Sequence, residues 1–358
     1  MIEGKLGFKY PYIDPEKCVN CGLCDINCPI CSKCEKHTPM VVYSYKGTDS
    51  ERLKSSSGGF FPLIANYFLD KGYYVSGVVF DDDFLTARYV LTCSADEIDA
   101  MRKSKYLEPD LNNVFQKIKV LLQSGERVLF VGLPCHVAGL MKYVKNKKNL
   151  VTIDLICFGA GSPKIYRESV LSFVHKNKLS IHELTKVDFR HKPFIDEEHT
   201  VIDLHFGKDV YTLKDKQFPY YYGFVNQLLL RESCYCCEYN SFDRISDLTI
   251  GDALGHGDAL GESIIMCNTD KGVQIVDSLK INHTFVEMDN KGVEETRGRF
   301  VKRSKPTSYV KVSEYKNYNR LERTYLNPKW NPCHIRIVAK LRRYGSKAKR
   351  YIKRIIKP

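Results

Sequence analysis

The sequence predicts an α/β (α+β) protein in which a mixed-sheet core follows a small cysteine-rich module and precedes a basic C-terminal helix. Three observations support this prediction. Four regularly spaced cysteines lie between residues 18 and 28, a strand–helix–strand pattern covers residues 127–156, and ten lysines and arginines lie in residues 334–358. We therefore expect four segments: the cysteine module (1–40), the core (41–305), a connector (306–333) and the basic tail (334–358).

The N-terminal cysteine run comprises Cys18, Cys21, Cys24 and Cys28, with the spacing C-x2-C-x2-C-x3-C-P. This is the spacing of a bacterial ferredoxin loop that holds a 4Fe-4S cluster. Gly22 lets the backbone approach the sulfurs, and Pro29 ends the loop. Zinc-bound or free cysteines are the alternative, but zinc usually takes two separated C-x2-C pairs. The run therefore indicates a ferredoxin-like iron–sulfur module and electron transfer.

The composition also favours metal-binding cysteines. The chain has 14 cysteines among 358 residues and opens on polar residues, without the apolar stretch of a secretory signal. It also lacks a run of about 18 apolar residues that could span a membrane. We therefore expect a cytoplasmic protein whose thiols stay reduced and bind metal rather than form disulfides.

The first part of the core is predicted from apolar periodicity and turn residues. The stretch from Lys54 to Gly59 (KSSSGG) precedes a helical pattern that starts at Phe60. Strands are expected at 73–80 and 87–92, a helix after a capping box formed by Ser94 and Glu97, and a helix at 111–123.

A βαβ unit is predicted at residues 127–156, with strands at 127–132 and 150–156 and a helix at 136–145. Such a unit makes a parallel strand pair with a right-handed crossover. Cys135 and Cys157 follow the two strands, so both should lie at the ligand-binding edge of the sheet. A later C-x2-C pair, Cys234 and Cys237, would complete a second four-thiolate site. Buried structural cysteines are the alternative.

The second half of the core is expected to contain shorter elements. Strands are predicted near 184–190, 200–206, 209–213, 247–251, 263–267 and 284–288, and helices near 216–230 and 270–280. Residues 289–333, with three prolines, should form an irregular connector.

Several motifs occur in a recognisable order between Gly7 and about Pro306. They are Gly7–Cys18, Leu53–Gly59 (LKSSSGG), Ser104–Tyr106 (SKY), Gly132–Cys135 (GLPC), Asp154–Cys157 (DLIC), Arg231–Cys237 (RESCYCC) and Ser246–Asp252 (SDLTIGD). Together they resemble the coenzyme F-420 hydrogenase/dehydrogenase beta-subunit family of iron–sulfur flavoproteins. The resemblance implies a flavoprotein core that binds FAD and a 4Fe-4S cluster, and so two clusters in all. It also implies that Cys135, Cys157, Cys234 and Cys237 hold the core cluster.

The resemblance places flavin contacts in two short segments. These are the loop residues Ser57, Gly58 and Gly59, and the motif Ser104, Lys105 and Tyr106. Backbone N–H groups at a helix start suit a phosphate or a flavin carbonyl. A plain N-cap by Ser57 is the alternative for the loop. Lys105 could stabilise a reduced, anionic flavin; Arg190 and Lys192 could do the same or form surface salt bridges. Asp252 could cap a turn or contact the cofactor. No catalytic residue is identified.

The chain also departs from the family. His136 stands where the family often has Gln, and Ala253-Leu254 replaces an aromatic pair. Only one of the two cysteine runs of a full ferredoxin is present. Either Cys28 closes the N-terminal cluster, which we prefer, or Cys31 or Cys34 replaces it.

The family implies an oxidoreductase that passes electrons between 4Fe-4S clusters and FAD, acting on an organic substrate or a deazaflavin-type carrier, by analogy in cell-surface polysaccharide biosynthesis. Two alternatives stay open. One is an electron-transfer subunit that feeds a separate redox partner protein, and the other is an interaction protein that has lost FAD.

The tail accounts for most of the net charge of +13, because ten of the 55 basic residues and none of the 42 acidic ones lie in 334–358. An apolar stripe runs through it: Ile337, Leu341, Tyr344, Ala348, Tyr351 and Ile355. This pattern is typical of an amphipathic helix on an anionic membrane, here the inner face of the cell membrane. A helix docked on a partner and a disordered tail are the alternatives. Nucleic acid is not expected, because no base-stacking platform accompanies the charge.

Overall fold

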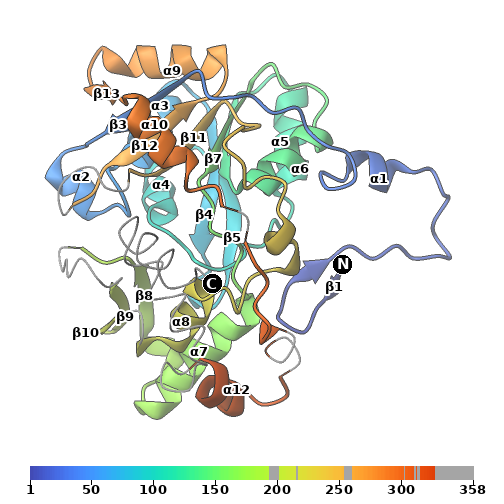
Figure 1. Cartoon of the computed structure of the whole chain (residues 1–358), viewed down its shortest axis with the longest axis vertical. Helices are drawn as coiled ribbons and strands as arrows, with labels where there is room; N and C mark the ends of the chain where they lie inside the picture. Colours follow the sequence, from blue (N-terminus) through green and yellow to red (C-terminus); the bar gives the residue numbers. More distant parts are fainter. Residues whose placement is uncertain are drawn as a thin grey trace, which may run out of the picture.

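A computed structural model describes residues 1–192, 201–214, 217–253, 260–301, 303–309, 312 and 315–326. The centre of the molecule is an eight-stranded mixed sheet with helices on both faces (Figure 1). In spatial order its strands are β13 (Phe285–Glu287), β3 (Val41–Tyr45), β12 (Ser263–Cys267), β11 (Leu248–Asp252), β7 (Leu150–Leu155), β6 (Val128–Gly132), β4 (Tyr74–Phe80) and β5 (Ala87–Thr92).

Four neighbouring strands in the middle of this sheet, β4, β6, β7 and β11, are parallel. The predicted βαβ unit is confirmed, since β6 pairs with β7 from Val128–Leu150 to Gly132–Asp154. Every residue of β6 is buried. Such burial on both faces explains why the strand is a continuous apolar run rather than an alternating one.

The helices that cover the sheet use apolar residues one turn apart. On one face lie α3 (Phe60–Asp70), α4 (Ala95–Met101) and α9 (Asp270–Lys280). The other face is covered by α5 (Val114–Gln123), α6 (Pro134–Tyr143) and α10 (Asn290–Arg297). In α5 the buried positions are Val114, Ile118 and Leu122. Helix α4 does begin after Ser94, but the Ser94 side chain makes no capping hydrogen bond, so the predicted capping box is wrong.

A second layer lies beyond the carboxyl ends of the parallel strands (Figure 1). It consists of a three-stranded antiparallel sheet and short helices: α7 (Pro163–Lys176), η1 (Ile181–Glu183), β8 (Leu184–Phe189), β9 (Val201–Phe206), β10 (Asp209–Lys214), α8 (Pro219–Val225), η3 (Glu232–Cys236) and α12 (Tyr318–Tyr325). Its apolar core joins α7 and α8 to the small sheet.

Three expectations for residues 160–333 need correction. Helix α7 has no counterpart in the predicted elements, although Ser162 caps it and Pro163 occupies its first turn. Helix α8 is shorter than the predicted 216–230. The connector at 289–333 is not irregular throughout, because it contains α10 and α12. Asp289 and Asn317 accept backbone hydrogen bonds at the starts of these two helices.

The N-terminal region has two parts. Residues 2–10 form a hairpin, β1 (Ile2–Glu3) and β2 (Lys9–Tyr10), and the side chains of Leu6 and Phe8 are buried in the second layer. The cysteine loop carries α1 (Leu23–Asn27), and α2 (Asp49–Leu53) follows β3. The domain boundary expected at residue 40 stays a prediction.

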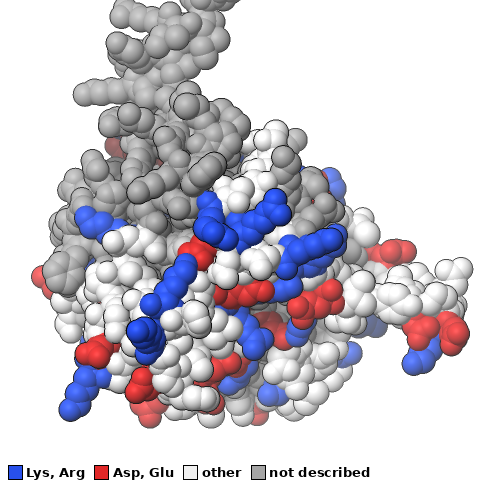
Figure 2. Space-filling view, turned by 90° about the horizontal axis from the view of Figure 1, so that it is seen from below, with Lys and Arg blue, Asp and Glu red and all other residues white. Residues whose placement is uncertain are grey.

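The basic tail predicted at 334–358 lies outside the described residues. Among the helices that are described, none is long and apolar enough to cross a membrane. On the face shown in Figure 2, basic and acidic side chains of the described residues are interspersed. This agrees with the conclusion that the strong positive charge belongs to the tail and not to the body.

Candidate functional site

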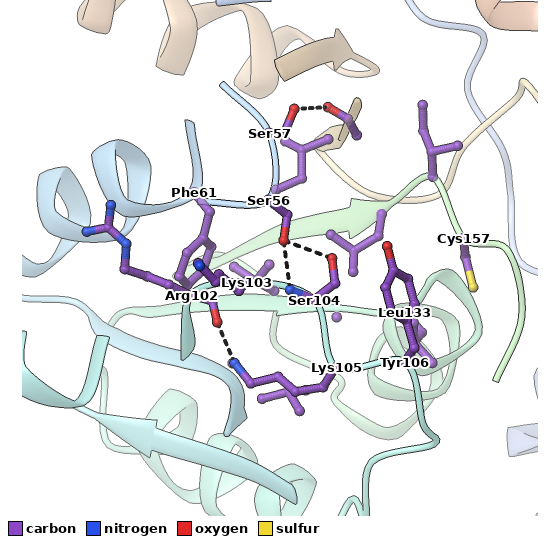
Figure 3. Close-up of a pocket in the computed structure, with 18 of the residues that line it drawn as sticks. Ser56, Ser57, Phe61, Arg102, Lys103, Ser104, Lys105, Tyr106, Leu133 and Cys157 are labelled. Carbon is purple, nitrogen blue, oxygen red and sulfur yellow. Dashed lines mark hydrogen bonds between the residues drawn. The ribbon is translucent and has the colours of Figure 1, made fainter. Parts of the chain in front are cut away.

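A cavity of 380 Å³ lies at the carboxyl ends of β6, β7 and β11 (Figure 3). Its lining comes mainly from Ser55–Ser57, Gly59–Pro62, Met101–Leu107, Val131–Leu133, Leu155–Ala160 and Ile250–Asp252. The carboxyl edge of parallel strands is where α/β proteins bind ligands, and ligand pockets usually measure about 300–1,000 Å³. Five of the six predicted flavin contacts line this cavity; Gly58 does not.

The serine–glycine loop reaches the cavity through hydrogen bonds that hold it against neighbouring segments. The Ser56 hydroxyl accepts from the Ser104 backbone N–H at 2.9 Å and lies 3.1 Å from the Ser104 hydroxyl (Figure 3). The Ser57 hydroxyl donates to the Glu262 carbonyl oxygen. The two predicted contact segments are thus bonded to each other.

Gly59, and not Ser57, is the N-cap of α3, so the N-cap alternative for Ser57 is wrong. Gly59 has φ = 87° and offers no side chain to the helix start. Gly59, Phe60 and Phe61 line the cavity. The Phe60 N–H already donates to the Ser263 hydroxyl at 3.4 Å, but the positive end of the helix dipole still faces the cavity and suits an anionic ligand group.

Gly58 has a different role from its neighbours. A Cβ atom at Gly58 would lie 2.2 Å from the Tyr45 carbonyl oxygen and 2.3 Å from the Ser263 backbone nitrogen. Only glycine lets the loop pack this closely on β3 and β12, so Gly58 positions the loop from behind the cavity wall.

Two cationic residues at the cavity adopt left-handed backbone conformations. Lys103 has φ = 64° and Arg190 has φ = 63°, which is uncommon for residues other than glycine. The Lys103 ammonium lies 2.5 Å from a buried carboxylate oxygen of Asp188, and Arg190 lies 2.5 Å from Asp252. Backbone strain of this kind often occurs at functional sites.

Two lysines near the cavity bind backbone carbonyls and have lowered pKa values. Burial lowers the pKa of Lys105 to about 7, although Asp188 opposes the shift. Its ammonium donates to the carbonyls of Ala100 (2.9 Å) and Arg102 (2.7 Å), and the second bond is drawn in Figure 3. Burial, together with the charge of Arg190, lowers the pKa of Lys192 to about 8. Lys192 donates to the Ser57 carbonyl at 2.9 Å and so braces the serine–glycine loop.

The core cysteine group (Cys135, Cys157, Cys234 and Cys237) is brought together from three segments. Cys135 lies in the first turn of α6, Cys157 follows β7, and Cys234 and Cys237 belong to η3 and its end. Burial raises the pKa of Cys135 well above its ordinary value, and the thiols of Cys157, Cys237 and Cys234 raise it further. Ionised thiols this close repel one another, so a bound cation would relieve their repulsion.

The chemistry of this group fits an iron–sulfur cluster. The Ala160 backbone N–H donates to the Cys234 sulfur at 3.4 Å, and hydrogen bonds to sulfur are typical of cluster ligands. Within the described ranges, no three His, Cys, Asp or Glu side chains are grouped closely enough to hold a single metal ion. A cubane cluster spreads its four thiolates over four irons and so needs them farther apart than one ion does.

The N-terminal cysteine run is more open. Cys18, Cys21 and Cys24 are exposed and Cys28 is half-buried. Burial acts to raise the pKa of Cys28, but backbone hydrogen bonds and the Cys31 thiol outweigh it and leave this pKa lowered. Cys31 therefore lies beside Cys28, and the choice of the fourth ligand stays a prediction.

Cys34 points toward the core instead, where its sulfur lies 3.7 Å from the Ala138 carbonyl oxygen of α6. The loop around it is held by Tyr239, whose hydroxyl donates to the Pro29 carbonyl, and by Lys142, which donates to Ser32 at 2.9 Å. The cysteine loop thus packs on the segment that carries Cys237.

A pair formed by the buried Tyr89 and the half-buried His136 was not predicted as a unit. The Tyr89 hydroxyl lies 3.0 Å from His136 Nδ1 and accepts from the Leu133 backbone N–H at 3.2 Å. The Tyr89 hydroxyl therefore donates its own hydrogen to His136, whose Nδ1 accepts it. Burial lowers the pKa of His136 to about 4, so the ring is neutral near pH 7. The departure from Gln at position 136 was a signal, but nothing in the sequence connects it to Tyr89.

A buried ion pair fixes the end of β7. Arg244 lies 2.8 Å from Asp154, and both side chains are at most 1% exposed. Arg244 also donates to the Leu155 carbonyl at 2.9 Å. Because Cys157 follows two residues later, this pair positions the strand end that delivers the thiol.

Comparisons with known proteins concern the family and the fold of this chain. Residues 125–291, which contain the whole core cysteine group, match the family described as the C-terminal part of the beta subunit of coenzyme F420 hydrogenase/dehydrogenase. A chain in a xenon-derivatised structure of the F420-reducing [NiFe] hydrogenase complex from Methanosarcina barkeri has a similar fold, with a TM-score of 0.52 and 17% identity. That match covers 74% of this chain and 88% of the other. No curated protein sequence matches this chain significantly.

Proposed function

We propose that the chain is an iron–sulfur flavoprotein oxidoreductase of the coenzyme F420 hydrogenase/dehydrogenase beta-subunit family, whose model matches residues 125–291. Its electrons would pass between 4Fe-4S clusters and FAD, and the substrate would be an organic compound or a deazaflavin-type carrier. One observation carries the proposal. Cys157 lines the cavity and also belongs to the core cysteine group, so a flavin and a cluster would lie on two sides of one short turn.

The residues that would hold FAD are Ser57, Gly58, Gly59, Ser104, Lys105 and Tyr106. When bound, FAD supplies the exchange between one-electron transfer and hydride chemistry. The N-terminus of α3 would face its anionic groups, and the mutual hydrogen bonds of Ser56 and Ser104 would keep the two contact segments in register. Lys105 also lines the cavity, and its ammonium is bonded to carbonyls at the end of α4.

The two cysteine sets would hold the clusters. The core cysteine group would bind one, and Cys18, Cys21, Cys24 and Cys28 would bind the other. The N-terminal loop contacts the segment of Cys237 through Tyr239, which supports an arrangement in which electrons enter through the exposed loop and continue to the core. Tyr239 is buried at this contact.

The test is the cofactor content of the anaerobically purified chain. We expect flavin absorption bands, a broad iron–sulfur shoulder and about eight irons per chain. Absence of flavin would refute the enzyme function. An iron content of about four per chain would mean that only one of the two clusters is present.

A second candidate is an electron-transfer subunit without a substrate of its own. The similarity in fold to a chain of a hydrogenase complex favours this reading. The two candidates differ in whether the isolated chain turns over. Reduction of deazaflavins or sugar intermediates by the chain alone supports the enzyme, whereas activity only after a partner is added supports the subunit.

Two finer proposals remain. A role in cell-surface polysaccharide biosynthesis rests on analogy with the family, and membrane binding by residues 334–358 rests on the sequence pattern of the tail. Flotation of the full chain with anionic vesicles, but not with neutral ones, would support the membrane proposal. Equal recovery without vesicles would refute it.

A further inference from the structure

Arg303 lies beside Cys157, which lines the cavity and belongs to the core cysteine group, and it falls outside the residues that match the family. Its Nη2 donates to the carbonyl oxygen of Cys157 at 2.7 Å. Its guanidinium also lies 5.4 Å from the centre of the Phe158 ring, which lines the cavity. The hydrogen bond and the ring contact together hold the guanidinium over the turn that separates the cavity from the thiols.

The charge of Arg303 lies close enough to act on two of the four thiols, those of Cys157 and Cys234. Arg244 also acts on Cys157, and Glu108 acts on Cys135.

Of the two arginines, Arg244 is neutralised by its buried partner Asp154. No ion pair of Arg303 is found among the described residues, so Arg303 supplies the less compensated positive charge beside Cys157. A fixed cation near sulfur ligands favours whichever state of the site carries more negative charge.

We propose that Arg303 raises the reduction potential of the group held by Cys135, Cys157, Cys234 and Cys237. The inference rests on the proposed function, because it requires a core iron–sulfur cluster. Reduction adds one negative charge to such a cluster, and the guanidinium stabilises that charge relative to the oxidised state. Arg303 thus acts as a tuning residue and takes no part in the chemistry at the substrate.

The experiment is a redox titration of the anaerobically purified full chain, with dithionite as reductant and the core-cluster signal followed by electron paramagnetic resonance. Arg303→Met removes the charge and the hydrogen bond, Arg303→Gln keeps an amide donor, and Arg303→Lys keeps the charge. Lys305→Met is the matched control. Lys305 is also a cation over an aromatic ring, Tyr309, in the same segment, but its ammonium pairs with Glu232.

We expect Arg303→Met and Arg303→Gln to change the oxidised-to-reduced ratio at a fixed potential by roughly tenfold, a shift of about 59 mV to lower values for a one-electron couple. Arg303→Lys should shift less, and Lys305→Met should match the wild type. If one neutral variant fails to assemble the cluster, the other decides the result.

Two outcomes would overturn the inference, and they are distinguishable. A wild-type core signal whose potential is unchanged in the neutral Arg303 variants would refute the role of Arg303 alone. If the wild type shows no core-cluster signal, and its iron content is the same as that of Cys157→Ser, both this inference and the proposed function would be refuted.

Discussion

Replacing Arg244 with methionine is expected to lower the free energy of unfolding by about 3–5 kcal/mol, because it leaves a buried carboxylate without its cation. Asp154 is 0% exposed and its Oδ2 already has no hydrogen-bond partner among the described residues. The other carboxylate oxygen would lose Arg244 and keep the Thr249 hydroxyl, at 2.6 Å. The carbonyls of Tyr239, Ser241 and Leu155 would also lose a donor.

The assay is urea unfolding of the variant and the wild type, followed by circular dichroism. Two controls separate the lost charge pair from lost packing. Asp154→Asn in the Arg244→Met background removes the stranded charge and should recover part of the loss. Arg231→Met removes a bidentate pair with Glu108, at 2.9 Å, in which both side chains are more exposed, and should have a smaller effect.

Acid should also relieve the defect of Arg244→Met. Burial raises the pKa of Asp154, and loss of Arg244 raises it further, so the folded state takes up a proton at a higher pH than the unfolded state does. The unfolding free energy of the variant should therefore fall as pH rises from the unfolded pKa through the folded pKa. A loss below about 1 kcal/mol, or a deficit that does not shrink in acid, would refute the reasoning that the pair is buried and mutually dependent.

Three further predictions concern the site. Cys157→Ser should lower the iron content from about eight to about four per chain, whereas Cys236→Ser, which changes an exposed cysteine next to the ligand set, should leave it unchanged. Equal iron contents in the two variants would contradict the ligand assignment. Gly58→Ala should lower the unfolding free energy by about 1–3 kcal/mol and weaken flavin retention, because its Cβ would lie 2.2 Å from a backbone atom. The control is Gly298→Ala, whose nearest contacts are at 3.4 Å, and equal stability of the two variants would rule out the clash. Burial lowers the folded pKa of Lys105 to about 7, so the unfolded state binds more protons than the folded state above pH 7. The unfolding free energy of the wild type should therefore rise toward pH 10 more steeply than that of Lys105→Met. Parallel pH profiles of the two proteins would contradict this.

The elements that sequence reasoning found correctly are those fixed by local patterns. The apolar run at 128–132 and the helix and strand after it predicted β6, α6 and β7 because a buried parallel strand cannot alternate polar residues. The misses have local causes as well. Helix α7 carries Ser162 and Pro163 as start signals, yet mixed polarity conceals its apolar face.

The candidate site was predictable only in part. Cys135 and Cys157 could be placed at one edge from strand direction alone, since both follow parallel strands. Arg303, the Tyr89–His136 pair and the Asp154–Arg244 pair gave no such signal, because their partners lie 47 to 146 residues away and depend on how the layers meet.

By itself the sequence determined the local patterns of this protein: cysteines in ferredoxin spacing, a glycine-rich helix start and a parallel strand pair, each set by bonds and contacts within a short segment. The tertiary structure decided which of these act together. It closed the cavity between the Ser57 loop and the 104–106 segment, gathered the core cysteine group from three segments, and set Arg303 beside Cys157. The physical reason is that burial and charge proximity, which set pKa values and reduction potentials, depend on packing between distant segments that no local pattern encodes.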